Sequence, residues 1–313
     1  MKTTNLHYSL VALLTLLLGL GIWLPQIIGS DNYPLDYHRV LVINGFVIFS
    51  IMGLARIKLS RLTGPLFFLA TITAFVSPDI SLCFQALLVI YLLLTQSAHE
   101  GLPLSVETIL KIIALFFLFA SALGPLVQQV HFSTYQLIEN ALLLFVLSQL
   151  ANKKSISILS NLGLSLFVFS CLFEHAYAEL FKFIIWILLL INSKEEIYSF
   201  PKEKNALERC RWFSLWCFPL GILAKFFAWD YGVHIAHFTF AGSFVLYVVL
   251  NLFIGSNEKI KGRIIYAITA AIIFGMLTRV SAIFMTEAYY RHLAYGALVI
   301  IGALIGALKI RKA

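Results

Sequence analysis

The sequence predicts an all-α fold, a polytopic membrane helix bundle of about twelve transmembrane helices. Hydrophobic residues make up 60% of the 313 residues and charged residues only 12%, whereas charged residues reach about 25% in soluble domains. Apolar runs recur along the whole chain at the length of about 20 residues that a spanning helix needs. Lys and Arg gather between alternate runs, as the positive-inside rule requires.

The helices are expected between the Gly, Pro and charged residues that interrupt the apolar runs. Their predicted ranges are 8–28, 39–56, 62–76, 80–97, 107–129, 134–151, 155–172, 175–193, 212–229, 231–254, 261–284 and 288–309. The run 62–76 is short, so it could form a re-entrant pair with its successor instead of spanning. Little length is left over, and residues 1–313 are predicted to form a single integral membrane domain.

Three further features narrow the class of protein. The run 8–28 is long for a signal peptide and lacks a small-x-small cleavage site, so it is expected to remain as the first helix. The four cysteines have no CxxC spacing, which indicates neither a disulfide framework nor a zinc or iron–sulfur site. The net charge of +8 lies in short loops beside helix ends, where it indicates topology and not nucleic-acid binding.

The basic residues assign a side of the membrane to each loop. In the predicted layout 17 of the 23 Lys and Arg residues fall on one side, which the positive-inside rule makes cytoplasmic. Both termini and the long loop 194–211 are therefore predicted to be cytoplasmic. The chain is expected in a bacterial inner membrane, in contact with its lipids.

Six of the eight histidines fall on the outer side of this layout, within about two helical turns of the interface. They are His38, His131, His175, His234, His237 and His292. Imidazole is a common ligand of metal ions and of haem iron, so such a layer suits a metal or haem site. A single interfacial histidine can instead be solvated or hydrogen-bonded, an interpretation that fits His131 and His175 best.

Charged residues inside apolar runs are costly and usually mark a function or an internal pair. Arg279 lies level with the outer histidines, where its guanidinium could bind a haem propionate or pair with Glu287 or Glu174. Glu179 and Lys182 are one turn apart and are expected to form an ion pair. Lys225 could neutralise Glu139, or either residue could belong to a proton path.

His38 stands seven residues before Gly45-Phe46, and His237 stands five before Gly242. These spacings resemble those of the NnrS family, haem- and copper-containing membrane proteins of nitric oxide metabolism. The family's second histidine and glutamate in the first motif are replaced here by Val40 and Leu41. The resemblance therefore implies a haem b more strongly than a copper ion.

The resemblance implies specific ligands for the haem. His38 and His237 are the expected axial ligands, with Arg279 near a propionate; His234, His175 and His292 are alternate or second-site metal ligands. The same two positions are similar to the low-spin haem ligands of haem–copper oxidases, on the second and tenth helices. The copper-site histidines of those oxidases have no counterpart, so oxygen reduction by that mechanism is not expected.

Two classes of function follow. The first is a haem-binding membrane protein of nitric oxide handling or electron transfer at the outer face, whose partner could be nitric oxide or another diatomic gas. The second is a transporter or structural membrane subunit with a transient outer metal site and with Glu139 and Lys225 on its path. Walker, GxGxxG, HExxH and GxSxG motifs are missing from the sequence, which argues against nucleotide-driven and hydrolytic chemistry.

Overall fold

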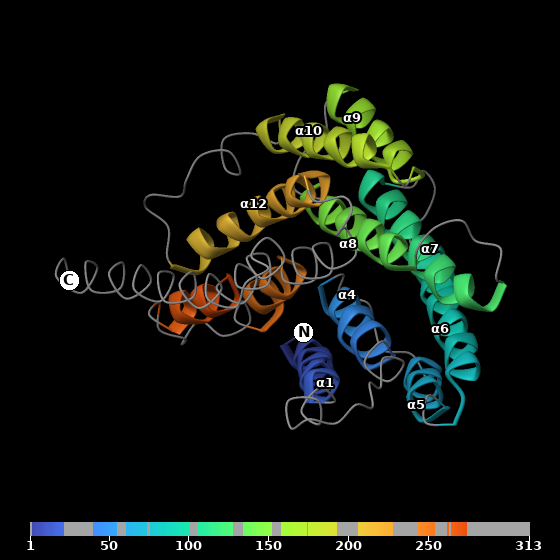
Figure 1. Ribbon diagram of the computed structural model, residues 1–313. Coiled ribbons are helices and arrows are strands. Elements are labelled where there is room, and N and C mark those ends of the chain that lie inside the picture. Colours follow the sequence, from blue (N-terminus) through green and yellow to red (C-terminus); the bar gives the residue numbers. More distant parts are fainter. Residues whose placement is uncertain are drawn as a thin grey trace, which may run out of the picture. The chain divides into compact units, whose positions relative to one another are not determined.

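The computed structural model is all-helical over the residues that it describes (Figure 1). These are residues 2–21, 40–54, 61–73, 76–99, 105–127, 134–151, 158–173, 175–192, 206–227, 243–253, 262 and 264–273. The chain divides into two compact units, residues 1–156 with 251–256 and residues 157–250 with 257–313. Each unit is considered by itself.

Among its described residues the first unit holds these helical elements. They are α1 (Lys2–Gly21), the π-helix η1 (Val40–Val47), α4 (Ile48–Leu54), α5 (Thr63–Thr73), α6 (Pro78–His99), α7 (Val106–Val127) and α8 (Thr134–Ala151). Consecutive helices pack as neighbours: α5 on α6, α6 on α7, and α7 on α8. The predicted all-α fold is therefore confirmed in this unit, whose helices pack on one another.

Helix α1 packs closely against η1 because each of the two helices has a glycine at the contact. A Cβ added at Gly45 would lie 2.3 Å from the Cβ of Thr15, and one at Gly19 would lie 2.8 Å from a methyl of Val42. Real side chains do not approach so closely, so neither glycine can be enlarged unless its neighbour shifts. Small residues in such seams let helix backbones approach.

The turn between α5 and α6 matches the predicted break at Ser77-Pro78-Asp79. Pro78 is the first residue of α6, where its fixed φ and missing N–H cost nothing. The buried Ser81 hydroxyl donates to the carbonyl of Ala70, 2.6 Å away, and so ties α6 to α5. Helix α5 has 11 residues and is about 16 Å long, too short by itself to cross a bilayer core.

The second unit contains α9 (Ile158–Ser170), α10 (Ala176–Asn192) and α12 (Ala206–Phe227), with α10 packed between the other two (Figure 1). A row of buried rings joins these helices. Trp186 of α10 lies 5.8 Å from Phe167 of α9 and 5.5 Å from Phe218 of α12, and Phe218 lies 6.2 Å from Tyr247, centroid to centroid. The core of this unit is thus largely aromatic.

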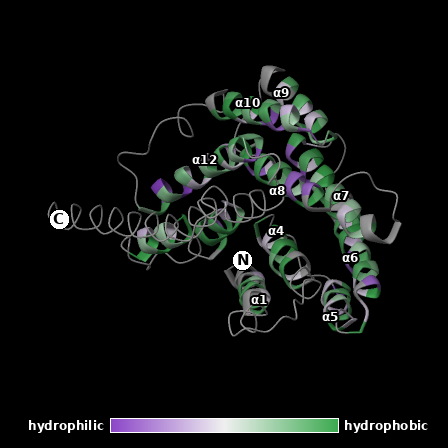
Figure 2. Ribbon diagram, in the orientation of Figure 1, coloured by the Kyte–Doolittle hydropathy of each residue, from purple (hydrophilic) through white to green (hydrophobic). Residues whose placement is uncertain are grey.

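On both α10 and α12, leucine side chains are exposed and charged side chains are buried. Leu188 of α10 and Leu220 of α12 are more than half exposed, while Glu179 and Lys182 of α10 and Lys225 of α12 are at most 5% exposed. Glu179 and Lys182 are about 60° apart around α10 and Leu188 is on the opposite side. Figure 2 shows the described helices mostly in the colours of apolar residues.

On α1, too, leucine side chains lie on the outward face. Its inward face carries Tyr8, Ala12 and Thr15, and its outward face is a stripe of leucines exposed by 40% to 57%. The stripe comprises Leu10, Leu13, Leu14, Leu17 and Leu18. A contiguous apolar surface of this kind marks contact with a membrane or with another protein.

Within the described residues, one stretch, Val106–Leu123 of α7, is long and apolar enough by length and composition to cross a membrane; the other apolar helices found are shorter. The predicted helices from 8–28 to 212–229 all coincide with observed helices, with some differences at the ends. Helix α12 begins at Ala206, inside the predicted loop 194–211. The predicted number of spans and the sides of the termini stay predictions.

Candidate functional site

The structure describes one of the predicted haem and metal ligands, His175. The others, His38, His234, His237, His292 and Arg279, lie outside the described residues. Among the described residues no group of three or more His, Cys, Asp and Glu side chains is arranged to hold a metal ion. The predicted haem site is therefore neither assembled nor excluded by the described part of the chain.

His175 stands at the start of α10 and is exposed. Its Nδ1 accepts a hydrogen bond from the backbone N–H of Tyr177 at 3.2 Å, and its ring stacks on the Tyr177 ring with centroids 5.2 Å apart. The imidazole thus caps the helix in the way that Ser or Asn commonly does. In the neutral form the proton is then on Nε2, so a metal ligand at Nε2 would require the other tautomer.

The motif that follows His38 lies in an unusual helix. Val40 to Val47 form the π-helix η1, which contains Gly45 and the buried Phe46. π-Helical turns are rare and frequently occur at functional sites, because the wider turn shifts the side chains that precede and follow it. The Gly45-Phe46 pair is thus placed against α1 at a conformationally distinct point in the chain.

The described residues include a buried cluster of charges, which we call the α10–α12 charge cluster: Glu179, Lys182 and Lys225. Oε1 of Glu179 lies 2.9 Å from Nζ of Lys182 and 3.3 Å from Nζ of Lys225. The predicted Glu179–Lys182 pair is present. Lys225 also contacts Glu179, and the sequence did not indicate this contact.

Helical spacing explains how the cluster forms. Glu179, Lys182 and Trp186 follow each other at three and four residues, so they share one face of α10. Phe218, Ile222 and Lys225 share one face of α12 for the same reason. Packing these two faces together stacks a charged layer on the Trp186–Phe218 aromatic layer.

The thiol of Cys171, just beyond the end of α9, is fully buried and within electrostatic range of all three charges. Three helices therefore converge on this point. A buried ion pair contributes little net stability, because desolvation offsets the attraction, but removing one partner leaves a costly buried charge. The cluster is consequently sensitive to the loss of Glu179, the one carboxylate of the three.

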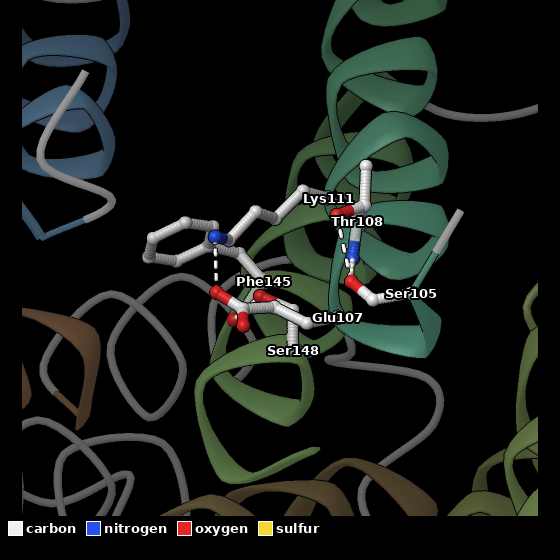
Figure 3. A network of polar contacts seen from close by, with 6 residues as sticks. All are labelled: Ser105, Glu107, Thr108, Lys111, Phe145 and Ser148. Atoms are coloured by element: carbon white, nitrogen blue, oxygen red, sulfur yellow. Dashed lines mark hydrogen bonds and ion pairs between the residues drawn. The ribbon is translucent and has the colours of Figure 1, made fainter. Parts of the chain in front are cut away.

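A third buried lysine, Lys111, provides a comparison within the first unit. Lys111 of α7 bonds to Glu107, one turn earlier in the same helix (Figure 3). At the start of that helix the hydroxyl of Ser105 caps the backbone N–H of Thr108 at 3.2 Å. The Glu107–Lys111 pair is formed within one helix, whereas the α10–α12 charge cluster joins two.

Comparison of the chain with protein-family models, curated proteins and solved structures finds no match. The resemblance to the NnrS family therefore rests on the sequence pattern, chiefly the spacing of His38, His237 and the glycines that follow them. The α10–α12 charge cluster is defined by the distances among its own side chains and does not depend on that resemblance.

Proposed function

We propose that the chain is a multi-pass protein of a bacterial inner membrane. The outward leucines of α1, α10 and α12 support this, together with the buried charged side chains of α10 and α12. Water favours the opposite arrangement, and a hydrocarbon solvent favours this one. The alternating Lys and Arg content of the loops supports the predicted orientation.

Within that membrane the proposed function is haem binding at a histidine site near the outer face, in nitric oxide handling or electron transfer. The layer of six outer histidines carries this proposal. His38 and His237 are proposed as the axial ligands and Arg279 as the partner of a propionate. The haem would supply a one-electron couple if both axial positions are filled, or a site for a diatomic gas if one is open.

The test is the absorption spectrum of the detergent-purified full chain, oxidised and reduced, together with its iron and copper content. We expect a Soret band with a reduced b-type spectrum, lost in H38A and in H237A. The matched control is H131A, which removes an outer histidine that is not a proposed ligand and should leave the spectrum intact. Protein that is folded, colourless and free of iron would refute the haem proposal.

A second candidate function is transport, and the α10–α12 charge cluster favours it. Ionised side chains inside a membrane bundle commonly mark the path of an ion or a proton. Reconstitution of the purified chain in vesicles with a pH-sensitive dye inside would test it. Transport that is lost in K225M would support this candidate, and vesicles without any flux would exclude proton and proton-coupled transport.

A further inference from the structure

Exposed apolar side chains form one stripe along each arm of the α9–α10 hairpin. On the α10 arm the side chains are exposed by 40% to 72%, and they are Tyr177, Phe181, Ile184 and Leu188. Their spacing of three and four residues keeps them on one face of the helix. On the α9 arm the side chains are exposed by 39% to 58%, and they are Leu162, Leu166, Phe169 and Phe173.

Two contacts fix the antiparallel register of these arms. The ring of Phe167 lies 5.8 Å from that of Trp186, centroid to centroid. A Cβ added at Gly163 would lie 3.4 Å from a methyl of Leu189. In this register each residue of the α9 stripe has a counterpart at about the same level in the α10 stripe, and both stripes begin at the turn between the helices.

The chemistry of both stripes changes with distance from the turn. Next to the turn the α9 arm exposes Phe169 and Phe173, whose ring centroids are 5.0 Å apart. The α10 arm exposes Tyr177 and Phe181 there, and farther from the turn both stripes continue as Leu and Ile. A bilayer presents the same order of environments, because aromatic rings concentrate at its interface and aliphatic side chains in its hydrocarbon core.

The turn itself carries two amphipathic rings. His175 and Tyr177 are both exposed, and their rings stack with centroids 5.2 Å apart. The backbone N–H of Tyr177 donates to Nδ1 of His175 at 3.2 Å, which holds the imidazole in place. A phenol and an imidazole combine an apolar body with a polar tip, so this pair suits a boundary between headgroups and hydrocarbon.

We propose that the α9–α10 turn binds the headgroup–acyl boundary of a lipid bilayer, with His175 and Tyr177 among the headgroups and both stripes against the acyl chains. This rests on the proposed membrane location and names the surface that meets the lipid. Helix α10 continues for about 23 Å beyond Tyr177, most of a hydrocarbon core of about 30 Å. Glu179 and Lys182 then lie about 3 and 8 Å below the boundary, in the outer part of the hydrocarbon region.

The experiment is electron paramagnetic resonance of the full chain, spin-labelled at one introduced cysteine and reconstituted in phosphatidylcholine vesicles. The background is C83S, because Cys83 is exposed whereas the other three cysteines are buried, and it should take up no label. Dissolved oxygen concentrates in hydrocarbon and a nickel chelate stays in water. We expect the ratio of oxygen to nickel accessibility to rise several-fold from Y177C through F181C to I184C.

The α9 arm supplies the matched series. F173C, F169C and L166C should give the same profile, and each replaces its α10 counterpart if that variant does not fold. Equal ratios near to and far from the turn would overturn the proposal. So would low accessibility to both reagents along the stripe with spin–spin broadening, the result expected if a second copy of the chain covers it.

Flotation of the unlabelled chain with the same vesicles tests the membrane location separately. A chain that floats but shows no accessibility gradient would refute this turn as the lipid boundary and leave the membrane proposal standing. A chain that does not float would refute both. The haem proposal has its own readout in the Soret band.

Discussion

The two units bring helices together in different ways. Between α1 and the 40–54 segment the contact is made by small residues, and Gly45 lies directly on Thr15. Between α10 and α12 the contact combines the Trp186–Phe218 ring pair with the charge pair Glu179–Lys225. The first seam depends on the absence of side-chain volume, and the second depends on the presence of a counter-charge. Substitutions should therefore affect the two seams by different mechanisms.

The largest effect is expected at Glu179. E179Q leaves two buried ammonium groups next to a neutral amide, and loss of one partner of a buried pair typically costs ~3–5 kcal/mol. The matched control is E107Q, which affects the more exposed Glu107–Lys111 pair and should cost about 1–2 kcal/mol. Chemical unfolding in detergent measures both, and equal losses would contradict the difference between these sites.

The next effect is expected in the small-residue seam. In G45A the new methyl would overlap Thr15, and overpacking of this kind costs about 1–3 kcal/mol. G64A is the control, since a Cβ at Gly64 would meet no atom within 4 Å. Thermal unfolding should separate the two variants, and adding T15G to G45A should recover part of the loss. A G45A protein as stable as G64A would disprove close contact here.

The pairing of Lys225 with Glu179 predicts a smaller, coupled effect. Because both side chains are in direct contact, the double variant E179Q/K225M should be less destabilised than the sum of its single variants, by about 0.5–3 kcal/mol. The same cycle with K111M in place of K225M should be additive. Additivity in both cycles would show that the 3.3 Å contact contributes no coupling.

The smallest loss of stability is expected at Ser105, which belongs to neither of the two helix contacts compared above. Ser105 caps the N-terminus of α7 through the backbone N–H of Thr108. S105A removes that acceptor and should cost about 0.5–2 kcal/mol, without a change in the absorption spectrum. S105D keeps an acceptor at the position and should restore the stability. Loss of stability in S105D as large as in S105A would argue against the cap.

The features predicted from the sequence are those set by local spacing. The apolar runs and their interruptions predicted the helices through 212–229. An apolar run forms a helix because the backbone N–H and C=O groups then bond to each other within the run. Glu179 and Lys182 were expected to pair because three residues separate them on one helix. The break before Pro78 was predicted from proline chemistry.

The features that the sequence did not predict depend on contacts between helices. Lys225 is 46 positions from Glu179 in the sequence, and no spacing rule connects residues on separate helices. The π-helix at 40–47 arises in a segment that packs against α1 through Gly45. On α10 the sequence did hold a signal for the buried face, since Glu179 and Lys182 are three residues apart on the side of the helix opposite Leu188.

The most direct test of the central claim, that this is a membrane bundle with apolar faces outward and charges inward, is cysteine labelling in spheroplasts. In a background with the four native cysteines replaced by serine, F173C lies at the predicted outer turn and R209C on the predicted cytoplasmic side. An impermeant maleimide should label F173C in intact spheroplasts and R209C only after lysis. Labelling of both only after lysis, with the protein recovered from the soluble fraction, would contradict the account.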